Sequence, residues 1–336
     1  MMANHQGLCK VPDPPGKEPD DNTATSPDGQ AGRQLPMFEV ASTNRDGAIP
    51  LVVVDHGPAR LGPARIQYGK SQTLLSPAGG FIKSYKFTLN PYSGCAFGCE
   101  YCYARFFAPT LEDQQTWGQW VRVKQNAVEL LRKARRSRSA ARRLERGDAV
   151  YMSTVTDPYQ PIEQRLGLTR AILEELIEVQ PRLTIQTRSP IATRDIDLFR
   201  QFERIRVNFT ITTDSEDVRL RYEPHTPAID VRLKAAETVA RAGVPIGISI
   251  SPMLPIRDTQ QFARRVANLD ATEYVTQFFK PTRSRFSAGS SPLALQLLRE
   301  DDWSEEKYRL VRRTLLDEFD QRHQLLEGDE GYAPPT

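Results

Sequence analysis

Short apolar runs alternate with amphipathic stretches along the middle of the chain. Six runs are largely apolar and rich in β-branched or aromatic residues, which predicts strands. They lie at residues 85–89, 149–153, 183–187, 207–212, 244–250 and 274–279. Between them, apolar residues recur at helical spacing at residues 166–180, 195–204, 230–243 and 259–269. Gly243 stands directly after the third of these helices, where a glycine commonly ends a helix.

Strands that alternate with helices predict parallel strands joined by crossovers. Six units are fewer than the eight of a closed barrel. The predicted fold class is therefore α/β, a partial (β/α)6 TIM-type barrel with parallel strands. In such folds the chemistry gathers at the carboxyl ends of the strands.

The ends of the chain differ in composition from its middle. The first 34 residues are rich in Pro, Asp and Gly with few large apolar side chains, so they predict a disordered N-terminal tail. The expected organisation has five parts. They are a disordered leader (1–34), extended or strand segments packed on the core (35–80), the core domain (81–290), a helical extension (291–326) and a frayed tail (327–336).

Composition and charge give little information about the partners or the cellular location of the protein. The 336 residues are 39% hydrophobic and 26% charged, an ordinary globular balance, and the formal charge is only +3. That charge is too small to indicate nucleic acid. No apolar run approaches the roughly 18 residues of a membrane span, and no signal peptide is visible, so we expect a cytoplasmic protein without membrane contact.

Three of the four cysteines fall within eight positions, in "NPYSGCAFGCEYCYARFF". Cys95, Cys99 and Cys102 have the spacing C-x3-C-x2-C and begin six residues after the first predicted strand, while Cys9 lies in the leader. An odd, tight trio is a poor disulfide framework and favours a reducing compartment.

The three cysteines are compatible with more than one kind of metal site. Structural zinc requires four protein ligands, and none of the histidines, His5, His56, His225 and His323, is close to the trio in the sequence. Zinc with a distant fourth ligand and plain buried cysteines remain alternatives. Three thiolates suit a 4Fe-4S cluster with one open iron. Such an iron can bind the amino and carboxylate groups of S-adenosyl-L-methionine, and an electron then releases a 5′-deoxyadenosyl radical.

The cysteine motif, with Tyr101 before its last cysteine, resembles the signature of the radical SAM superfamily. Five longer segments resemble the spore photoproduct lyase-like branch. They are "NPYSGCAFGCEYCYAR", "STVTDPYQPIEQRLGLTRAILEEL", "IQTRSPIATRDIDLF", "FTITTDSEDVRLRYEP" and "AGVPIGISISPMLP". The likeness covers residues 70–285.

The resemblance implies a role for each matching residue. Cys95, Cys99 and Cys102 become the cluster ligands, and Tyr101 lies against the adenine. Ser153 and Thr154 stand where the methionine amino group is held, although the usual glycine pair is absent. Arg188 stands where a cation grips the carboxylate. Thr210 and Thr212 are expected at the ribose, and Tyr103 is the expected catalytic tyrosine. For any of these non-cysteine positions the alternative is a polar residue that merely ends a strand.

One departure from the family concerns repair. Spore photoproduct lyase returns hydrogen to its product through a cysteine near the end of the second strand. This chain has Ser153, Thr154, Val155 and Thr156 there. An aliphatic hydroxyl holds its hydrogen too strongly to replace a thiol, so radical generation is expected but this repair is not.

Polar residues outside these motifs give weaker signals. An arginine-rich stretch, "RKARRSRSAARRLERGD" at 132–148, follows a helical pattern and is expected to continue that helix, either as a phosphate-binding surface or as a solvated face. Arg283 and Arg285 follow the sixth predicted strand and are expected at the substrate mouth. Glu223 and His225 follow the fourth, in a loop where polar side chains are more often exposed than catalytic.

The leading hypothesis is therefore a radical SAM enzyme acting on a substrate, with nucleic acid favoured. It would receive electrons from a small reductase of the flavodoxin or ferredoxin type. The alternatives are an iron-sulfur sensor that binds nucleic acid without catalysis, and modification of a peptide or small metabolite. A sensor has no reason to place polar residues at the strand ends.

Overall fold

A computed structural model describes residues 57–279, 290–319 and 324–336. The chain divides into two units, 1–36 and 37–336, and every described residue belongs to the second. Several predictions fall outside the described residues. They concern the leader, residues 35–56, Cys9, Arg283 and Arg285.

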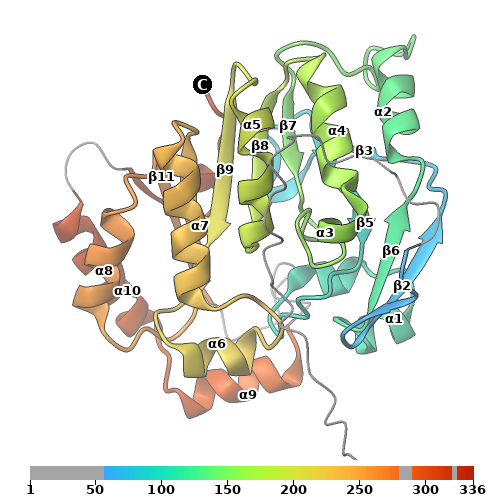
Figure 1. The fold of residues 1–336 in the computed structure, drawn as a ribbon. Helices are drawn as coiled ribbons and strands as arrows, with labels where there is room; N and C mark the ends of the chain where they lie inside the picture. Colours follow the sequence, from blue (N-terminus) through green and yellow to red (C-terminus); the bar gives the residue numbers. More distant parts are fainter. Residues whose placement is uncertain (1–56, 280–289, 320–323) are drawn as a thin grey trace, which may run out of the picture. The chain divides into compact units, whose positions relative to one another are not determined.

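A sheet of eight strands forms the centre of the described part, in the order β12-β11-β10-β9-β8-β7-β4-β3 (Figure 1). The strands are β3 (Leu75–Pro77), β4 (Phe87–Leu89), β7 (Ala149–Met152), β8 (Arg182–Thr187), β9 (Ile205–Thr210), β10 (Ile246–Met253), β11 (Glu273–Phe278) and β12 (Leu325–Glu327). Neighbours from β4 to β12 are parallel, and β3 is antiparallel to β4. The six predicted strands are confirmed as β4, β7, β8, β9, β10 and β11, and β12 adds a parallel strand that was not predicted.

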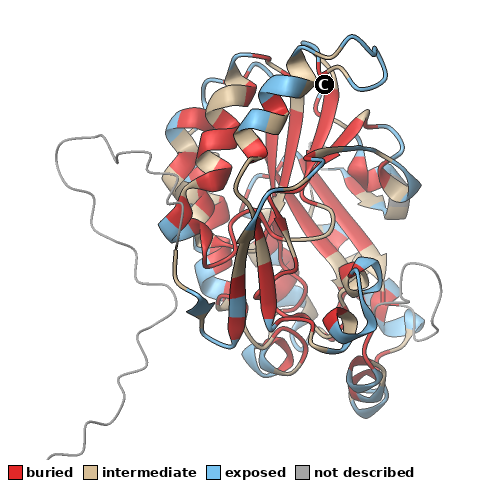
Figure 2. Ribbon diagram, turned by 90° about the vertical axis from the view of Figure 1, so that its right-hand side faces the viewer, coloured by how far each residue is buried: buried red, intermediate tan, exposed pale blue. Residues whose placement is uncertain are grey.

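The central strands are nearly continuous apolar runs in the sequence because both faces of the sheet are buried. Every residue of β7 and β9 is buried, and Figure 2 shows the strands almost wholly in the buried colour. Parallel strands covered by crossover helices have this property. Side-chain alternation therefore carried less information here than length and β-branched composition.

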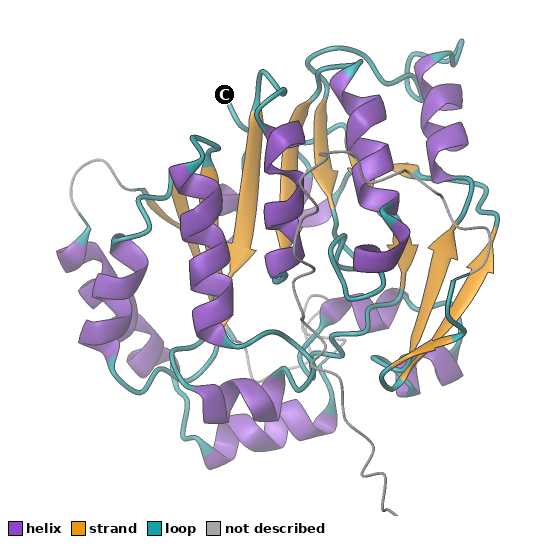
Figure 3. Cartoon of the chain, viewed as in Figure 1, coloured by secondary structure: helices purple, strands orange, loops and turns teal. Residues whose placement is uncertain are grey.

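Helices connect the strands and cover the sheet (Figure 3). They are α3 (Glu163–Leu166), α4 (Leu168–Ile177), α5 (Ile196–Phe199), α6 (Glu216–Tyr222), α7 (Ile229–Arg241) and α8 (Thr259–Ala267), with the short 3-10 helix η3 (Pro190–Asp195) before α5. The four predicted helical segments correspond to α4, α5, α7 and α8. Gly243 has φ +78°, in the left-handed region that suits glycine after a helix. This alternation confirms the α/β class.

A second, smaller sheet combines two strands that precede β4 in the sequence with two that lie between β4 and β7. Its order is β1-β2-β6-β5, with β1 (Arg60–Leu61), β2 (Ala64–Gly69), β5 (Tyr92–Ser93) and β6 (Trp120–Lys124). Between β5 and β6 come the cysteine loop, η2 (Tyr103–Phe107) and α1 (Leu111–Gln115). This insertion carries the cysteines at the carboxyl end of β4.

The C-terminal part differs from its prediction. The expected helical extension contains α9 (Pro292–Glu300) and α10 (Glu305–Glu318), but it ends in strand β12. The expected frayed tail instead contains η4 (Gly328–Tyr332), whose Tyr332 is buried. The Ala333 carbonyl accepts hydrogen bonds from Tyr85 Oη at 2.9 Å and Arg206 Nη2 at 2.7 Å. One aromatic anchor and one strand order a segment whose composition looked unstructured.

The arginine-rich stretch also departs from its prediction. Helix α2 (Ala127–Arg135) includes its first residues but ends at Arg135. Ser137 and Ser139 then form a local turn, in which Ser139 N donates to Ser137 Oγ at 3.3 Å. Such a turn competes with helical hydrogen bonding, and repulsion among closely spaced arginines weakens a helix further.

The arginine-rich stretch lies at the amino ends of the central strands. Lys86, just before β4, donates to Arg143 O at 3.0 Å, and Arg182, at the start of β8, donates to Gly147 O at 3.0 Å. In Figure 1 α2 and the loop after it are at the top, while β8 and β9 point downward. The stretch is therefore at the opposite end of the sheet from the carboxyl ends.

No helix among the described residues is both long enough and apolar enough to span a membrane.

Candidate active site

A large cavity opens where the carboxyl ends of the central strands meet the cysteine loop. Its volume is about 200 Å³, and it is open to solvent. Its wall brings together the cysteine loop, the ends of strands β7 to β11 and the C-terminal η4. Nine of the ten predicted site residues line it: Cys95, Cys99, Tyr101, Cys102, Tyr103, Ser153, Thr154, Arg188 and Thr210. The tenth, Thr212, lies behind this wall.

The loop after β7 holds the cysteine loop in place. Gln160 Oε1 accepts a hydrogen bond from Ala96 N at 3.0 Å, and Thr156 Oγ1 donates to Gly94 O at 2.6 Å. Gly98 has φ +58°, and a Cβ on the neighbouring Gly118 would lie only 2.8 Å from the Gly98 Cα. The motif "TDPYQP" therefore supports the loop, while two glycines allow it to pack closely.

The three thiols are poorly solvated. Cys95 and Cys99 are buried and Cys102 is half-buried, and none forms a disulfide. Burial raises the pKa of all three, that of Cys99 to about 12, although the Arg188 cation opposes the rise at Cys99 and Cys102. Bare thiolates are thus unfavourable here, and iron would supply the missing positive charge.

The described residues contain no group of three or more His, Cys, Asp and Glu side chains arranged to hold one metal ion. His225 packs near the loop, since a Cβ on Gly98 would lie 3.5 Å from its Cδ2, but it does not line the cavity. The chemistry of the donors fits an iron-sulfur cluster, because three cysteines line one cavity.

Unpaired polar atoms on the wall point to a ligand. Among the described residues, four cavity-lining side chains have a buried nitrogen or oxygen without a hydrogen-bond partner: Trp117 Nε1, Ser153 Oγ, Arg188 Nε and Ser290 Oγ. Buried polar groups in folded proteins are usually satisfied. A polar ligand in the cavity would satisfy them, which suits a group that carries amino, carboxylate and ribose functions.

Tyr101 and Arg188 meet on the cavity wall beside the cysteines. Arg188 Nη2 donates to Tyr101 Oη at 3.0 Å, and the Arg188 guanidinium lies 5.8 Å from the centre of the Tyr101 ring. Arg188 follows β8 directly, and its backbone N–H donates to Asp157 Oδ2 at 2.8 Å. The cation is thereby fixed near the predicted adenine and carboxylate positions.

Glu223 lies behind this pair and is completely buried. It accepts hydrogen bonds from Tyr101 Oη and, at 2.8 Å, from Thr212 Oγ1, and it pairs with Arg232 at 2.5 Å. Burial acts to raise its pKa, but the Arg232 and Arg188 cations outweigh burial and lower the pKa to about 2. The expectation that this loop glutamate is exposed was wrong.

The remaining predicted residues occupy the ends of β7 and β9. Ser153 is buried, and Thr154 is held by Asn90, whose Oδ1 accepts from Thr154 N at 2.9 Å. Thr210 Oγ1 accepts from Gln186 Nε2 at 2.6 Å. Tyr103 Oη donates to the Thr154 carbonyl. The structure assembles these residues around one space, while their individual roles remain predictions.

The chain matches a known protein family. A model described as the radical SAM superfamily matches residues 89–266, more than half of the chain. The chain therefore belongs to the radical SAM superfamily.

Two relatives that are similar in sequence are described as uncharacterized proteins. An uncharacterized protein of Methanocaldococcus jannaschii is 35% identical over 174 residues, which cover 52% of this chain and 62% of the relative. An uncharacterized protein of Mycobacterium tuberculosis is 28% identical over 179 residues, which cover 51% of this chain and 50% of the relative. The chain thus spans between half and about three fifths of the length of these relatives.

Solved structures of spore photoproduct lyase share the fold. A complex with a dinucleoside spore photoproduct has a TM-score of 0.55 at 18% identity, covering 78% of this chain and 81% of that one. A mutant with bound AdoMet and dinucleoside spore photoproduct has a TM-score of 0.56 at 17% identity over the same shares. The predicted resemblance in fold is confirmed.

Two residues were not predicted as site residues: Glu223, which lies behind the wall, and Tyr332, which lines it. Glu223 was judged from its loop position alone, although the buried Arg232 that pairs with it lies only nine residues further on. Tyr332 lines the cavity from a segment expected to be frayed. The sequence gives no local signal for either residue, because the neighbouring Arg221 and Tyr222 bind Asp301 and not Glu223.

Proposed function

We propose that this protein is a radical SAM enzyme in which Cys95, Cys99 and Cys102 hold a 4Fe-4S cluster with one open iron. When bound there, the cluster supplies the electron that splits S-adenosyl-L-methionine and yields a radical able to remove hydrogen from a substrate. The observation that carries the proposal is that all three cysteines share one cavity with Ser153 Oγ and Arg188 Nε, two buried atoms that have no hydrogen-bond partner.

The wall residues would bind and orient the nucleotide. Arg188 would hold its carboxylate, because a guanidinium offers paired donors to that group. The Tyr101 ring would lie against the adenine, and Ser153 and Thr154 would bind the amino group. Thr210 would meet the ribose, whereas Thr212 would act through Glu223, which its hydroxyl already binds. Tyr103 would face the substrate.

Nucleic acid is the substrate class that we favour. Aromatic side chains on the wall, Phe81, Tyr103, Phe278, Phe279 and Tyr332, offer stacking surfaces, and Gln186, Ser249, Ser251 and Gln277 offer polar groups. Stacking combined with hydrogen bonding is how proteins bind unpaired bases. The repair activity of spore photoproduct lyase supports the same class by likeness of fold alone. We further propose a cytoplasmic setting with a flavodoxin- or ferredoxin-type electron donor.

Anaerobic reconstitution tests the proposal. The protein is loaded with iron and sulfide, reduced with dithionite and incubated with S-adenosyl-L-methionine, and 5′-deoxyadenosine is measured. We expect about four irons per chain, as a 4Fe-4S cluster requires, and steady product formation. A Cys99→Ala variant should lose both. Zinc in the purified protein, or an intact cluster with no product over many hours, would contradict the proposal.

Filter binding of oligonucleotides at several salt concentrations tests the substrate class. Contacts with phosphates make affinity fall as salt rises. Affinity that does not respond to salt would argue against nucleic acid and return attention to peptides and small metabolites.

A further inference from the structure

Glu223 connects the predicted nucleotide-binding residues to the protein core. It sits at the end of α6, while its contacts come from the cysteine loop (Tyr101), the segment after β9 (Thr212) and α7 (Arg232). Arg188 Nε, after β8, lies 3.6 Å from the same carboxylate. One side chain thus reaches four separate segments of the barrel.

Two arginines share the Glu223 carboxylate. Arg188 and Arg232 are both cationic, and Glu223 is the one carboxylate that pairs with either among the described residues. Arg232 is 1% exposed and binds Glu223 more closely, at 2.5 Å. Arg188 meets Glu223 only at 3.6 Å, and its Nε lacks a hydrogen-bond partner. The buried Asp157 carboxylate nearby already accepts from the Arg188 backbone N–H and from Thr187 Oγ1. An anionic group in the cavity would complete this arrangement.

Tyr101 is oriented by the same carboxylate. Its hydroxyl donates to Glu223 and accepts from Arg188, so the side chain can swing away only if both bonds break. Arg232 is itself fixed by Pro227 O at 2.8 Å and by Thr226 Oγ1. The position of Glu223 is therefore determined by α7 and the loop before it.

We propose that Glu223, held by Arg232, is a positioning residue that orients Tyr101 and Arg188 toward S-adenosyl-L-methionine. The inference rests on the proposed function and adds a residue to it. Glu223 touches neither the cluster nor the cavity surface. It acts by fixing an aromatic face and a cation before the nucleotide arrives, so less ordering is needed on binding.

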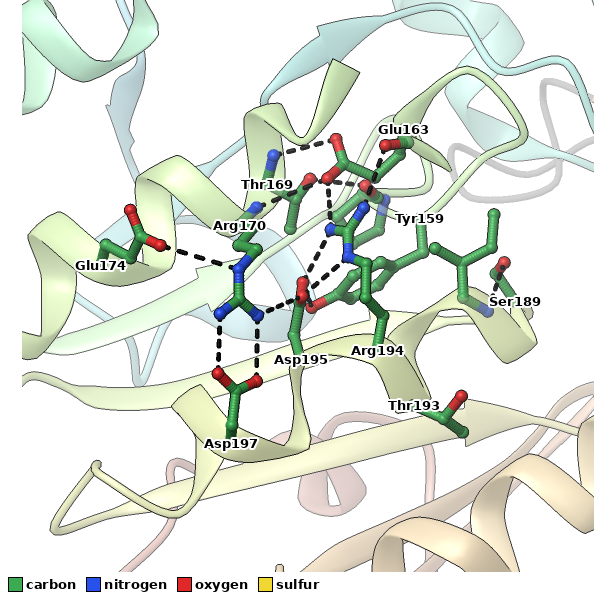
Figure 4. A network of polar contacts seen from close by, with 12 residues as sticks. Tyr159, Glu163, Thr169, Arg170, Glu174, Ser189, Thr193, Arg194, Asp195 and Asp197 are labelled. Carbon is green, nitrogen blue, oxygen red and sulfur yellow. Dashed lines mark hydrogen bonds and ion pairs between the residues drawn. The ribbon is translucent and has the colours of Figure 1, made fainter. Parts of the chain in front are cut away.

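A matched pair of variants tests the proposal. Glu223→Gln keeps the shape and removes the charge. Glu163→Gln makes the same change at another fully buried glutamate, which accepts from Tyr92 Oη and pairs with Arg194 at 2.7 Å but does not line the cavity (Figure 4). Both should lower the unfolding temperature, whereas only the first should affect the nucleotide.

The main measurement is the dissociation constant of S-adenosyl-L-methionine by calorimetry on anaerobically reconstituted protein. We expect Glu223→Gln to weaken binding about 10- to 100-fold, the usual range for a supporting residue behind a bound group. Glu163→Gln should stay within about threefold of the parent. At saturating nucleotide, the Glu223→Gln variant should retain its rate of 5′-deoxyadenosine formation within a few-fold.

A double-mutant cycle provides an independent readout. Tyr101→Phe keeps the ring and removes the hydroxyl that Glu223 binds. If Glu223 acts through that hydroxyl, the double variant should bind more tightly than two independent losses predict. Thr212→Val, which removes one weaker bond to the carboxylate, is the substitute if Glu223→Gln does not fold, and it should weaken binding several-fold.

The outcomes separate this inference from the proposed function. Parent protein that holds no cluster or binds no nucleotide would overturn both. A parent that binds, together with a Glu223→Gln variant that binds equally well, would overturn the positioning role alone. Equal weakening by Glu163→Gln would also overturn it, since the effect would then be general destabilisation.

Discussion

At the scale of single residues, the close contact between Gly98 and Gly118 limits what the cysteine loop tolerates. Gly118 has φ +94°, and an added Cβ would lie 2.8 Å from the Gly98 Cα, which is backbone and cannot move aside like a side chain. We expect Gly118→Ala to displace the loop, to lower the iron bound after reconstitution by more than half, and to cost about 2–4 kcal/mol of unfolding free energy. Iron analysis and denaturant unfolding measure these effects.

Gly147 provides the control for that prediction. It has φ +78° but open space where a Cβ would lie. Gly147→Ala should cost only the backbone penalty of about 1–2 kcal/mol and leave iron binding intact. Equal iron loss in both variants would show that φ, and not the contact with Gly98, is what matters.

At the scale of elements, a polar network joins the loop after β7 to the loop after β8 (Figure 4). Asp195 is fully buried and binds Arg170 at 3.0 Å, Arg194 at 2.8 Å and Tyr159 Oη at 3.1 Å. Asp195→Ala would leave Arg170 without a fully buried carboxylate and Arg194 with Glu163 alone, so we expect a loss of about 3–5 kcal/mol in denaturant unfolding.

Asp197 is the matched control in the same network. It also pairs with Arg170, at 2.7 Å, but its side chain is 57% exposed. Asp197→Ala should cost no more than about 1 kcal/mol, because solvent weakens exposed ion pairs. A similar cost for the two variants would mean that burial does not set the strength of this network.

The arginine-rich stretch gives a second element-scale prediction. Arg136, Arg138 and Arg142 form no ion pair among the described residues, and they lie at the end of the sheet opposite the cavity. Replacing all three by Gln should leave the affinity for S-adenosyl-L-methionine and the rate of 5′-deoxyadenosine formation within about twofold. If oligonucleotide affinity and its salt dependence fall in the same variant, the stretch is a separate docking surface. A loss of nucleotide affinity would contradict the separation.

At the scale of the whole molecule, the sequence was informative where the signal is local. The six strands could be predicted because each is a short β-branched run with clear ends. Predicting the strands also located the polar residues at their ends, such as Ser153, Arg188 and Thr210. Glu223 could not, because its burial depends on Tyr101, which is 122 positions away. Tyr332 depends likewise on contact with Phe81, whose ring centre is 4.9 Å from its own. Pairing across such separations leaves no periodic trace.

The described cavity wall has no thiol apart from the three proposed cluster ligands, and this leads to the last prediction. The described residues contain three free cysteines, and all three are the proposed cluster ligands. Ser153 Oγ is buried on the wall without a partner, and its O–H bond is too strong to return hydrogen to a carbon radical. We therefore expect no thymine restored from spore photoproduct in irradiated DNA, although 5′-deoxyadenosine is formed. Chromatography of digested DNA measures this.

Ser153→Cys provides the companion experiment, because it places a thiol on the cavity wall. If spore photoproduct binds, this variant should restore a measurable fraction of thymine where the parent restores none. Efficient repair by the parent would show that another group donates the hydrogen, and the phenols Tyr103 and Tyr332 on the same wall would then be the next to replace by Phe. A phenol is the more suitable donor of the two hydroxyl classes, because its oxygen radical is stabilised by the ring.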